Sequence, residues 1–146
     1  MERHSWKIEG LDIQPHLIEL AKYNAELCSL NIKFHLANLC TFTAETPYTL
    51  ILSNPPWQPL GTGKISPYPS KNISHFELLC SLPDILSFLV RNLAPEGDAL
   101  LLYPDFRIFE LQTLIPKTPL DIFDLTPCVG LDKYYICHIR CKGTKQ

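Results

Sequence analysis

Apolar residues along the chain form short runs and helical repeats that predict alternating strands and helices. The run at 48–52 is continuous, which is typical of a strand buried on both faces, as in parallel sheets. Residues 32–36 alternate instead and predict a half-buried strand. Residues 15–28 carry apolar side chains at helical spacing and predict a helix with Pro15 in its first turn. The apolar positions of that helix are Leu17, Leu20, Ala21, Leu27 and Cys28.

The second half of the chain continues the alternation. A helix is expected to begin near Pro83, with Ser81 as its cap. Its expected buried face is Ile85, Leu86, Leu89 and Val90. The remaining expected elements are a strand at 6–12, an irregular loop at 58–72, a helix at 74–80, a turn at 95–98, a strand at 99–103, a helix at 106–115 capped by Asp105, and strands at 120–125 and 133–141 joined by a turn around Gly130. This order predicts an α/β sheet with a C-terminal antiparallel hairpin at one edge.

Composition narrows the class of protein. At 146 residues, with 46% hydrophobic and 19% charged residues, the chain is expected to form one soluble globular domain over residues 1–146. A net charge of -2 gives no global basic field, so a nucleic-acid partner would need a local patch or a further domain. No apolar run approaches the roughly 18 residues that span a bilayer, and residues 1–6 lack a signal-peptide core. We therefore expect a cytoplasmic protein without a membrane partner.

Six cysteines are spread along the chain without a C-x-x-C pair. They are Cys28, Cys40, Cys80, Cys128, Cys137 and Cys141. Several adjoin apolar segments, where a free thiol behaves as a small hydrophobic side chain. We expect reduced, structural cysteines and no metal site, with metal or disulfide roles as the alternatives.

The strand at 48–52 ends in Ser53-Asn54-Pro55-Pro56-Trp57. An exocyclic amine conjugated to a ring or a carbonyl is a poor nucleophile, and two acceptors aimed at its N–H bonds can orient its lone pair toward an electrophile. The side-chain oxygen of Asn54 and the carbonyl of Pro55 form such a pair, and the two prolines hold it rigidly. Trp57 can stack on a base or a flat amide. The alternative is a proline-terminated strand with a packing tryptophan.

Two further polar residues follow expected strands. Asp12 ends the first strand, where an acidic side chain in nucleotide-binding sheets accepts hydrogen bonds from ribose hydroxyls. Without that context, an aspartate before a helix is a cap or a turn residue. Asn38 follows the strand at 32–36, and a solvated turn asparagine is the equally weighted alternative to a ligand contact.

Asn54-Pro55-Pro56-Trp57 closely resembles the Asn-Pro-Pro-aromatic signature of class I S-adenosylmethionine-dependent methyltransferases that act on amino groups. The resemblance implies a Rossmann-like sheet, S-adenosylmethionine as cofactor, and catalytic roles for Asn54, Pro55, Pro56 and Trp57. It also implies cofactor contacts from Asp12, Ile13, Asn38, Leu39 and Asn54. Asn38 stands where the family usually has an aspartate, and its oxygen can still accept from an adenine amino group.

The resemblance is closest to bacterial tRNA adenine-N6 methyltransferases. The supporting stretches are Gly61–Gly63, Ser66–Pro69, Leu82–Leu86 and Leu93–Gly97, followed by Arg107 and Leu111. It implies adenine N6 in tRNA or another RNA as the acceptor. The alternatives are the amide of a protein glutamine, and an inactive methyltransferase-like module.

Such sheets normally begin with one strand and helix that carry a Gly-rich turn against the cofactor. No G-x-G-x-x-G follows a strand here, and Gly61-Thr62-Gly63 comes after the Asn-Pro-Pro-Trp segment. We therefore expect a sheet that lacks its first strand–helix unit. The expectation has three explanations: a preceding N-terminal segment, a partner chain that completes the cofactor site, or a degenerate domain.

Overall fold

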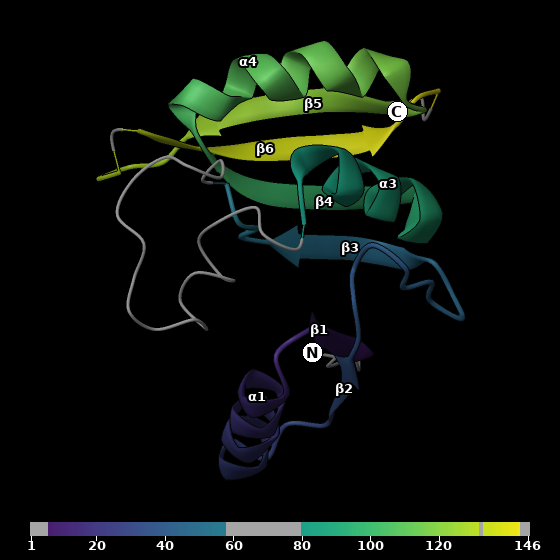
Figure 1. Ribbon diagram of the computed structural model, residues 1–146, viewed down its shortest axis with the longest axis vertical. Coiled ribbons are helices and arrows are strands. Elements are labelled where there is room, and N and C mark those ends of the chain that lie inside the picture. The colour runs from purple at the N-terminus through teal and green to yellow at the C-terminus, as the bar shows by residue number, and fades with distance from the viewer. Residues whose placement is uncertain (1–5, 58–79, 132, 144–146) are drawn as a thin grey trace, which may run out of the picture. The chain divides into compact units, whose positions relative to one another are not determined.

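The protein is described from a computed structural model that places residues 6–57, 80–131 and 133–143 (Figure 1). The chain divides into two compact units, Met1–Phe42 and Thr43–Gln146, and each is described by itself. The single domain expected over residues 1–146 stays a prediction. The expected loop at 58–72 and all but Cys80 of the expected helix at 74–80 lie outside the described residues.

The first unit consists of strand β1 (Ile8–Asp12), helix α1 (Pro15–Leu27) and strand β2 (Ile32–Leu36). The two strands run parallel, which confirms the expected strand–helix–strand order. Gly10 pairs with Phe34, whose ring lies so close that a Cβ atom at Gly10 would be 2.8 Å from Cδ1 of the phenylalanine. Glycine therefore allows the aromatic ring to cover the middle of β1.

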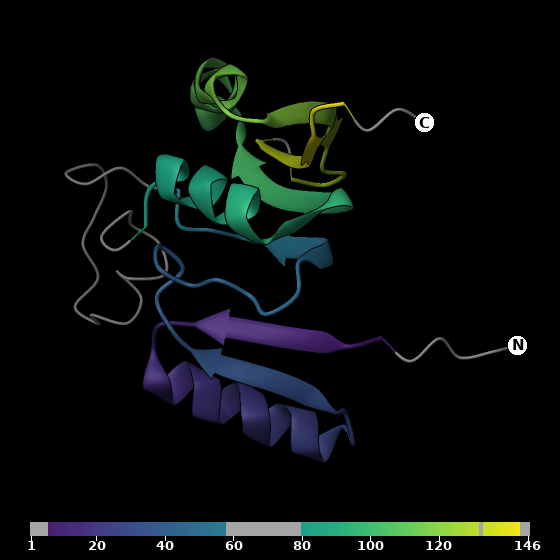
Figure 2. The same ribbon diagram turned by 90° about the vertical axis from the view of Figure 1, so that its right-hand side faces the viewer.

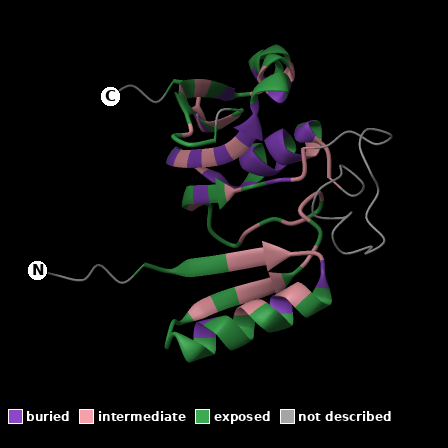
Figure 3. Cartoon of the chain, turned by 90° about the vertical axis from the view of Figure 1, so that its left-hand side faces the viewer, coloured by how far each residue is buried: buried purple, intermediate pink, exposed green. Residues whose placement is uncertain are grey.

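The buried face of α1 is narrower than the apolar pattern predicted. Ile18 and Ala25 are its buried residues, whereas Leu20 and Leu27 are 54% and 66% exposed (Figure 3). A helix packed on a two-stranded sheet has only a narrow surface against which to bury side chains, so the wider stripe remains accessible. The helix ends at Leu27, one residue before the end of the expected range 15–28, and Ser29 adopts a φ of 53° shortly after it.

The second unit contains a four-stranded sheet in the order β3-β4-β6-β5 (Figures 1 and 2). Strands β3 and β4 are parallel, whereas β6 is antiparallel to both β4 and β5. The expected C-terminal antiparallel hairpin is therefore confirmed. The elements are β3 (Tyr48–Ser53), α3 (Leu82–Asn92), β4 (Leu93–Pro104), α4 (Asp105–Leu114), the 3₁₀ turn η1 (Ile115–Lys117), β5 (Leu120–Pro127) and β6 (Tyr134–Cys141).

The core of this unit is formed by the sheet with side chains of helices α3 and α4 (Figure 3). Ser81 precedes the helix as predicted, and its backbone N–H donates to Oδ2 of Asp84 at 2.9 Å. The fully or almost fully buried apolar residues include Leu82, Ile85, Leu89, Ala99, Leu101, Tyr103, Leu111, Leu120 and Ile139. Val90, which we expected to be buried, is 41% exposed.

Strand β3 is buried on one face only, so the prediction of burial on both faces is wrong. Ile51 is buried and pairs with Ala99, a core residue of β4. Leu50 and Leu52 point to the opposite face, because side chains alternate along a strand, and they are 38% and 67% exposed. The apolar run thus marks a strand correctly but overstates how much of it is covered.

Residues 95–98, where a turn was expected, lie inside β4, at the point where its pairing with β3 shifts in register. Tyr48 pairs with Leu93, while Leu50 pairs with Asp98, so β4 contains extra residues at this point. Gly97 is needed there, because a Cβ atom would lie 2.8 Å from the carbonyl oxygen of Tyr48. This close backbone approach fixes how β3 sits beside β4.

Helix α4 begins one residue earlier than expected. Pro104 is its N-cap, and Asp105 is the first helical residue, with Oδ1 accepting from the Phe106 N–H at 2.6 Å. The helix then continues through Pro116 as η1 instead of stopping at the proline. Among the described residues, no helix combines the length and the apolar character that a bilayer crossing requires.

Candidate active site

Asp12 and Asn38 lie at the same edge of the first unit. Asp12 is the last residue of β1, and Asn38 follows β2, which pairs in parallel with β1. The Ala37 N–H donates to the carbonyl oxygen of Asp12 at 3.1 Å, which ties the two strand ends together. The structure thus places both residues at the carboxyl end of parallel strands, the edge where ligands bind in α/β sheets.

Asp12 is half-buried and uses one carboxylate oxygen locally. Its Oδ1 accepts from the Gln14 N–H at 2.8 Å, which shapes the turn into α1. Among residues 6–57, 80–131 and 133–143, no donor bonds to its Oδ2. The side chain therefore serves the turn and retains an acceptor for a ligand.

Asn38 is exposed and also organises a turn. Its Oδ1 accepts from the Cys40 N–H at 2.9 Å, and its backbone oxygen accepts from the Phe42 N–H at 2.9 Å. An amide oxygen has two lone pairs, so the turn does not exhaust it. Ile13 and Leu39, the expected backbone neighbours of the cofactor, are both half-buried.

The Asn54–Trp57 segment belongs to the second unit and follows β3 directly. Ser53 is the last paired residue, opposite Leu101 of β4. Asn54 is then exposed, Pro55 is buried, and Pro56 and Trp57 are half-buried. The polar amide therefore projects beside a rigid, buried backbone at the carboxyl end of a parallel strand.

Trp57 is held by side chains from two other elements. The Arg107 Nη1 of α4 donates to the carbonyl oxygen of Trp57 at 2.7 Å. The indole makes edge-on contacts with Phe106 and Tyr134, with centroids 5.8 and 5.9 Å away. Arg107 is only 4% exposed, and its Nη2 lies 2.9 Å from Oε2 of Glu110.

Sequence reasoning did not assign these supporting roles. Arg107 entered only as part of the family resemblance, and Phe106 and Tyr134 were not singled out. One signal was available, because Arg107 stands four residues before Leu111 on a helix face that is otherwise buried. A charged residue on a buried helical face requires compensating partners, and it therefore indicates a specific contact.

A second polar cluster lies between β4 and β6. Oδ1 of Asp98 accepts from Arg140 Nε at 2.5 Å and is 2.6 Å from His138 Nε2. The Arg140 guanidinium also lies 3.9 Å from the centroid of the Phe123 ring. The hydrogen bonds from Arg140 and His138 hold the pKa of the Asp98 carboxyl below its usual value of 3.8. This cluster fixes the register of the β4–β6 pair.

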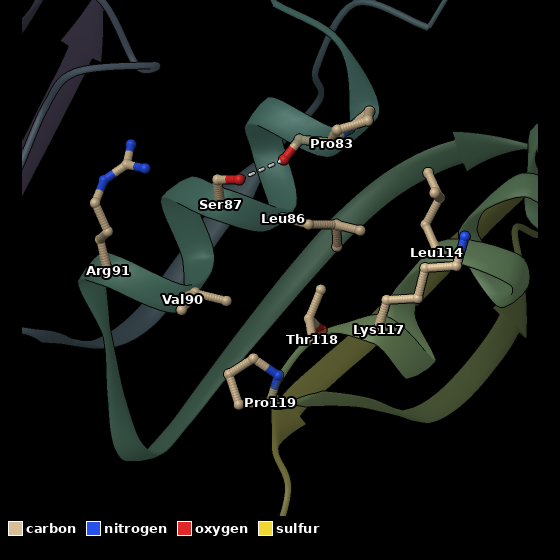
Figure 4. A pocket seen from close by; sticks show the side chains of 9 residues that line it. All are labelled: Pro83, Leu86, Ser87, Val90, Arg91, Leu114, Lys117, Thr118 and Pro119. Atoms are coloured by element: carbon tan, nitrogen blue, oxygen red, sulfur yellow. Dashed lines mark hydrogen bonds between the residues drawn. The ribbon is translucent and has the colours of Figure 1, made fainter.

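A cavity of about 410 Å³ opens between α3 and the start of β5 (Figure 4). Leu86 and Val90 of α3 point toward it, with Leu114, Thr118 and Pro119 on the facing side (Figure 4). None of its lining residues belongs to the predicted site.

The six cysteines form no disulfide bond with one another. All six cysteines are free thiols, and burial raises the pKa of Cys137 to about 12. The described residues hold no cluster of three or more histidine, cysteine or acidic side chains that could bind a metal ion.

No family model matches the chain. A stretch of 53 residues, 36% of this chain, is 42% identical to a protein of Methanocaldococcus jannaschii that is provisionally named a protein N5-glutamine methyltransferase. The match spans 26% of that relative.

Solved structures resemble far more of the chain. A ribosomal protein L11 methylase from Lactobacillus delbrueckii superposes with a TM-score of 0.65 at 13% identity, over 93% of this chain and 58% of its own. An S-adenosylmethionine-dependent methyltransferase from Clostridium acetobutylicum superposes with a TM-score of 0.67 at 8% identity, over 94% of this chain and 76% of its own. A Pyrococcus abyssi tRNA (uracil-54, C5)-methyltransferase was solved with S-adenosyl-L-homocysteine. It superposes with a TM-score of 0.57 at 12% identity, over 92% of this chain and 28% of its own. The chain thus has the Rossmann-like fold of S-adenosylmethionine-dependent methyltransferases and spans little more than half of the first of these relatives.

Proposed function

We propose that the Asn54–Trp57 segment transfers a methyl group from S-adenosylmethionine to an exocyclic amino group. The observation that carries the proposal is the exposed amide of Asn54 at the carboxyl end of parallel strand β3, beside the buried Pro55. The methyltransferase fold supports the same chemistry.

The first unit offers groups that fit the proposed cofactor. Oδ2 of Asp12 can accept from ribose hydroxyls, while Oδ1 stays with the Gln14 N–H. The amide of Asn38 can accept from an adenine amino group, and the backbone N–H of Leu39 can donate to a ring nitrogen. When bound, S-adenosylmethionine supplies an electrophilic methyl group on a sulfonium.

The residues of the second unit prepare the acceptor nitrogen. Asn54 Oδ1 and the carbonyl of Pro55 accept hydrogen bonds from its two N–H groups, which orients the lone pair toward the methyl group. A bound cofactor would supply the methyl group, and its sulfur would keep the electron pair of the broken C–S bond as a neutral thioether. The surplus proton on nitrogen then passes to solvent.

Adenine N6 in tRNA or another RNA is the first acceptor that we propose. Its amino group is conjugated to a ring that can stack on Trp57, with Phe106, 60% exposed, at the edge of the indole. A protein glutamine is the second candidate, because the sequence relative from Methanocaldococcus jannaschii carries that name. A glutamine amide presents the same pair of N–H groups to Asn54 and Pro55.

Acceptor identity can be measured directly. The full chain is incubated with methyl-tritiated S-adenosylmethionine and either unmodified bulk tRNA or a glutamine-rich protein extract, and each product is hydrolysed to nucleosides or amino acids. We expect label in N6-methyladenosine. Label only in N5-methylglutamine would replace RNA by protein as the substrate. No label in either product, together with no heat of binding on titration with S-adenosylmethionine, would indicate the inactive module.

A further inference from the structure

We infer that Arg107 is a positioning residue that fixes the backbone of the Asn54–Trp57 segment for methyl transfer, an inference that rests on the function proposed for that segment. The side chain reaches Trp57 from helix α4, fifty positions later in the chain. It donates to the segment's backbone at the carbonyl oxygen of Trp57.

The burial of Arg107 requires specific partners. A guanidinium that is 4% exposed has lost nearly all of its hydration, which is costly unless its N–H groups are hydrogen-bonded. Nη1 donates to the Trp57 carbonyl, and Nη2 pairs with the half-exposed carboxylate of Glu110. Because the guanidinium is planar and its N–H directions are fixed, the Glu110 contact also sets the direction of the bond to Trp57.

The hydrogen bond from Arg107 fixes the C-terminal end of the Asn54–Trp57 segment, and the sheet fixes its N-terminal end. Ser53 pairs with Leu101 in the sheet, so the backbone enters the segment at a defined point. The rings of Pro55 and Pro56 restrict φ at the next two positions but leave ψ free to vary. Anchoring the carbonyl of Trp57 removes that remaining freedom. Asn54 and the Pro55 carbonyl therefore lie between two fixed points.

Two aromatic rings fix the side chain of the same residue. Phe106 and Tyr134 contact the indole edge-on, at interplanar angles of 76° and 75°. Phe106 adjoins Arg107 on α4, while Tyr134 begins β6. The backbone and the side chain of Trp57 are thus both held by elements other than the strand that precedes it.

Fluorescence of Trp57 reports this anchoring independently of catalysis. Trp6 is 70% exposed, and a Trp6→Phe chain leaves Trp57 as the sole tryptophan. In that background we compare Arg107→Met, Arg107→Lys and the control Gln112→Ala, an exposed position on the same helix. Acrylamide quenching of Trp57, the dissociation constant of S-adenosylmethionine and kcat are measured for each variant.

We expect Arg107→Met to increase the quenching constant and to lower kcat on the order of tenfold to hundredfold, with the dissociation constant of S-adenosylmethionine unchanged. Arg107→Lys should bring the quenching constant and kcat part of the way back to the parent values. An ammonium can still donate to the Trp57 carbonyl, but it lacks the second N–H group that pairs with Glu110. Gln112→Ala should stay close to the parent. A quenching constant that is the same in the parent, Met and Lys chains overturns the inference, and so does an unchanged kcat in an active chain.

The outcomes separate this inference from the proposed function. Increased quenching in Arg107→Met, in a parent chain that methylates neither RNA nor protein, would support the anchoring of Trp57 and contradict the methyltransferase activity. If the methionine variant does not fold, the lysine variant carries the same test, since it retains the charge and one donor.

Discussion

Asn54 and Arg107 show which single-residue roles a sequence can reveal. The Asn54–Trp57 segment could be proposed from the sequence because an acceptor, a rigid backbone and an aromatic ring stand in four consecutive residues. Arg107 acts on the same segment from fifty positions away, and that contact depends on how α4 packs. The role of the segment therefore stays a prediction from the sequence, whereas the contact from Arg107 could only be found in the structure.

Asp12 has one carboxylate oxygen in a turn and a second available for a ligand. We predict that Asp12→Asn, which keeps the acceptor for Gln14 but removes the charge, weakens S-adenosylmethionine binding about tenfold, because hydrogen bonds to a charged acceptor are the stronger ones. Isothermal titration calorimetry measures the change, with the exposed Glu26→Gln as control. Equal dissociation constants for the variant and the parent would remove Asp12 from the cofactor site.

Cys28 and Cys137 should differ sharply in reactivity. Cys137 is completely buried, and its pKa is raised to about 12, so at pH 8 almost none of it is thiolate. Cys28 is exposed at the end of α1. We predict that N-ethylmaleimide modifies Cys28 in the folded protein and Cys137 only after denaturation, as judged by peptide mass spectrometry. Modification of both thiols at the same rate in the native state would show that Cys137 is not buried.

At the scale of elements, the local sequence patterns predicted which helices and strands form, and in which order, better than they predicted which of their side chains are buried. The expected strand at 32–36 is reproduced residue for residue, because alternation and its flanking polar residues define it locally. The exposure of Leu50 and Leu52 could not be read from an apolar run, since burial depends on which other elements cover the strand. For the same reason α1 buries Ile18 and Ala25 instead of its full apolar stripe.

Gly97 controls how β3 sits beside β4. We predict that Gly97→Ala destabilises the protein by about 1–3 kcal/mol. The new Cβ atom would meet the Tyr48 carbonyl at 2.8 Å and displace β3, the strand that Asn54 follows. Urea unfolding followed by circular dichroism gives the free energy, with the neighbouring exposed Glu96→Ala as control. A stability equal to that of the parent would mean that the β3–β4 register adjusts without cost.

The Asp98 cluster should make the β4–β6 pair sensitive to acid. Because the folded-state pKa lies below the usual 3.8, the carboxylate stabilises the fold fully above that value, and the stabilisation is lost as the pH falls through the lowered pKa. We predict that Asp98→Asn reduces the melting temperature at neutral pH and that this difference shrinks in acid. The exposed Asp121→Asn on β5 is the control. A difference that is independent of pH would exclude this carboxylate as its source.

At the scale of the whole molecule, the order of elements was sufficient to predict the fold class. The parallel β1–β2 and β3–β4 pairs and the antiparallel β5–β6 hairpin all follow the order expected from the sequence, and the likeness to solved methyltransferases agrees with it. Among the described residues, β1 pairs only with β2 and β3 only with β4, and the expected lack of a first strand–helix unit stays a prediction. The division into two compact units was not predicted, because no composition change marks it.

Turnover by an Asn54 variant tests the central claim most directly. Methyl transfer is measured as kcat for the full chain, for Asn54→Ala and for Thr49→Ala, an exposed position on the same strand. We predict that Asn54→Ala lowers kcat on the order of 10²–10³-fold, as expected when one preorganised acceptor is lost, and that its thermal unfolding and the activity of Thr49→Ala stay as in the parent. A kcat for Asn54→Ala equal to that of the parent would contradict the assignment of this segment as the methyl-transfer site.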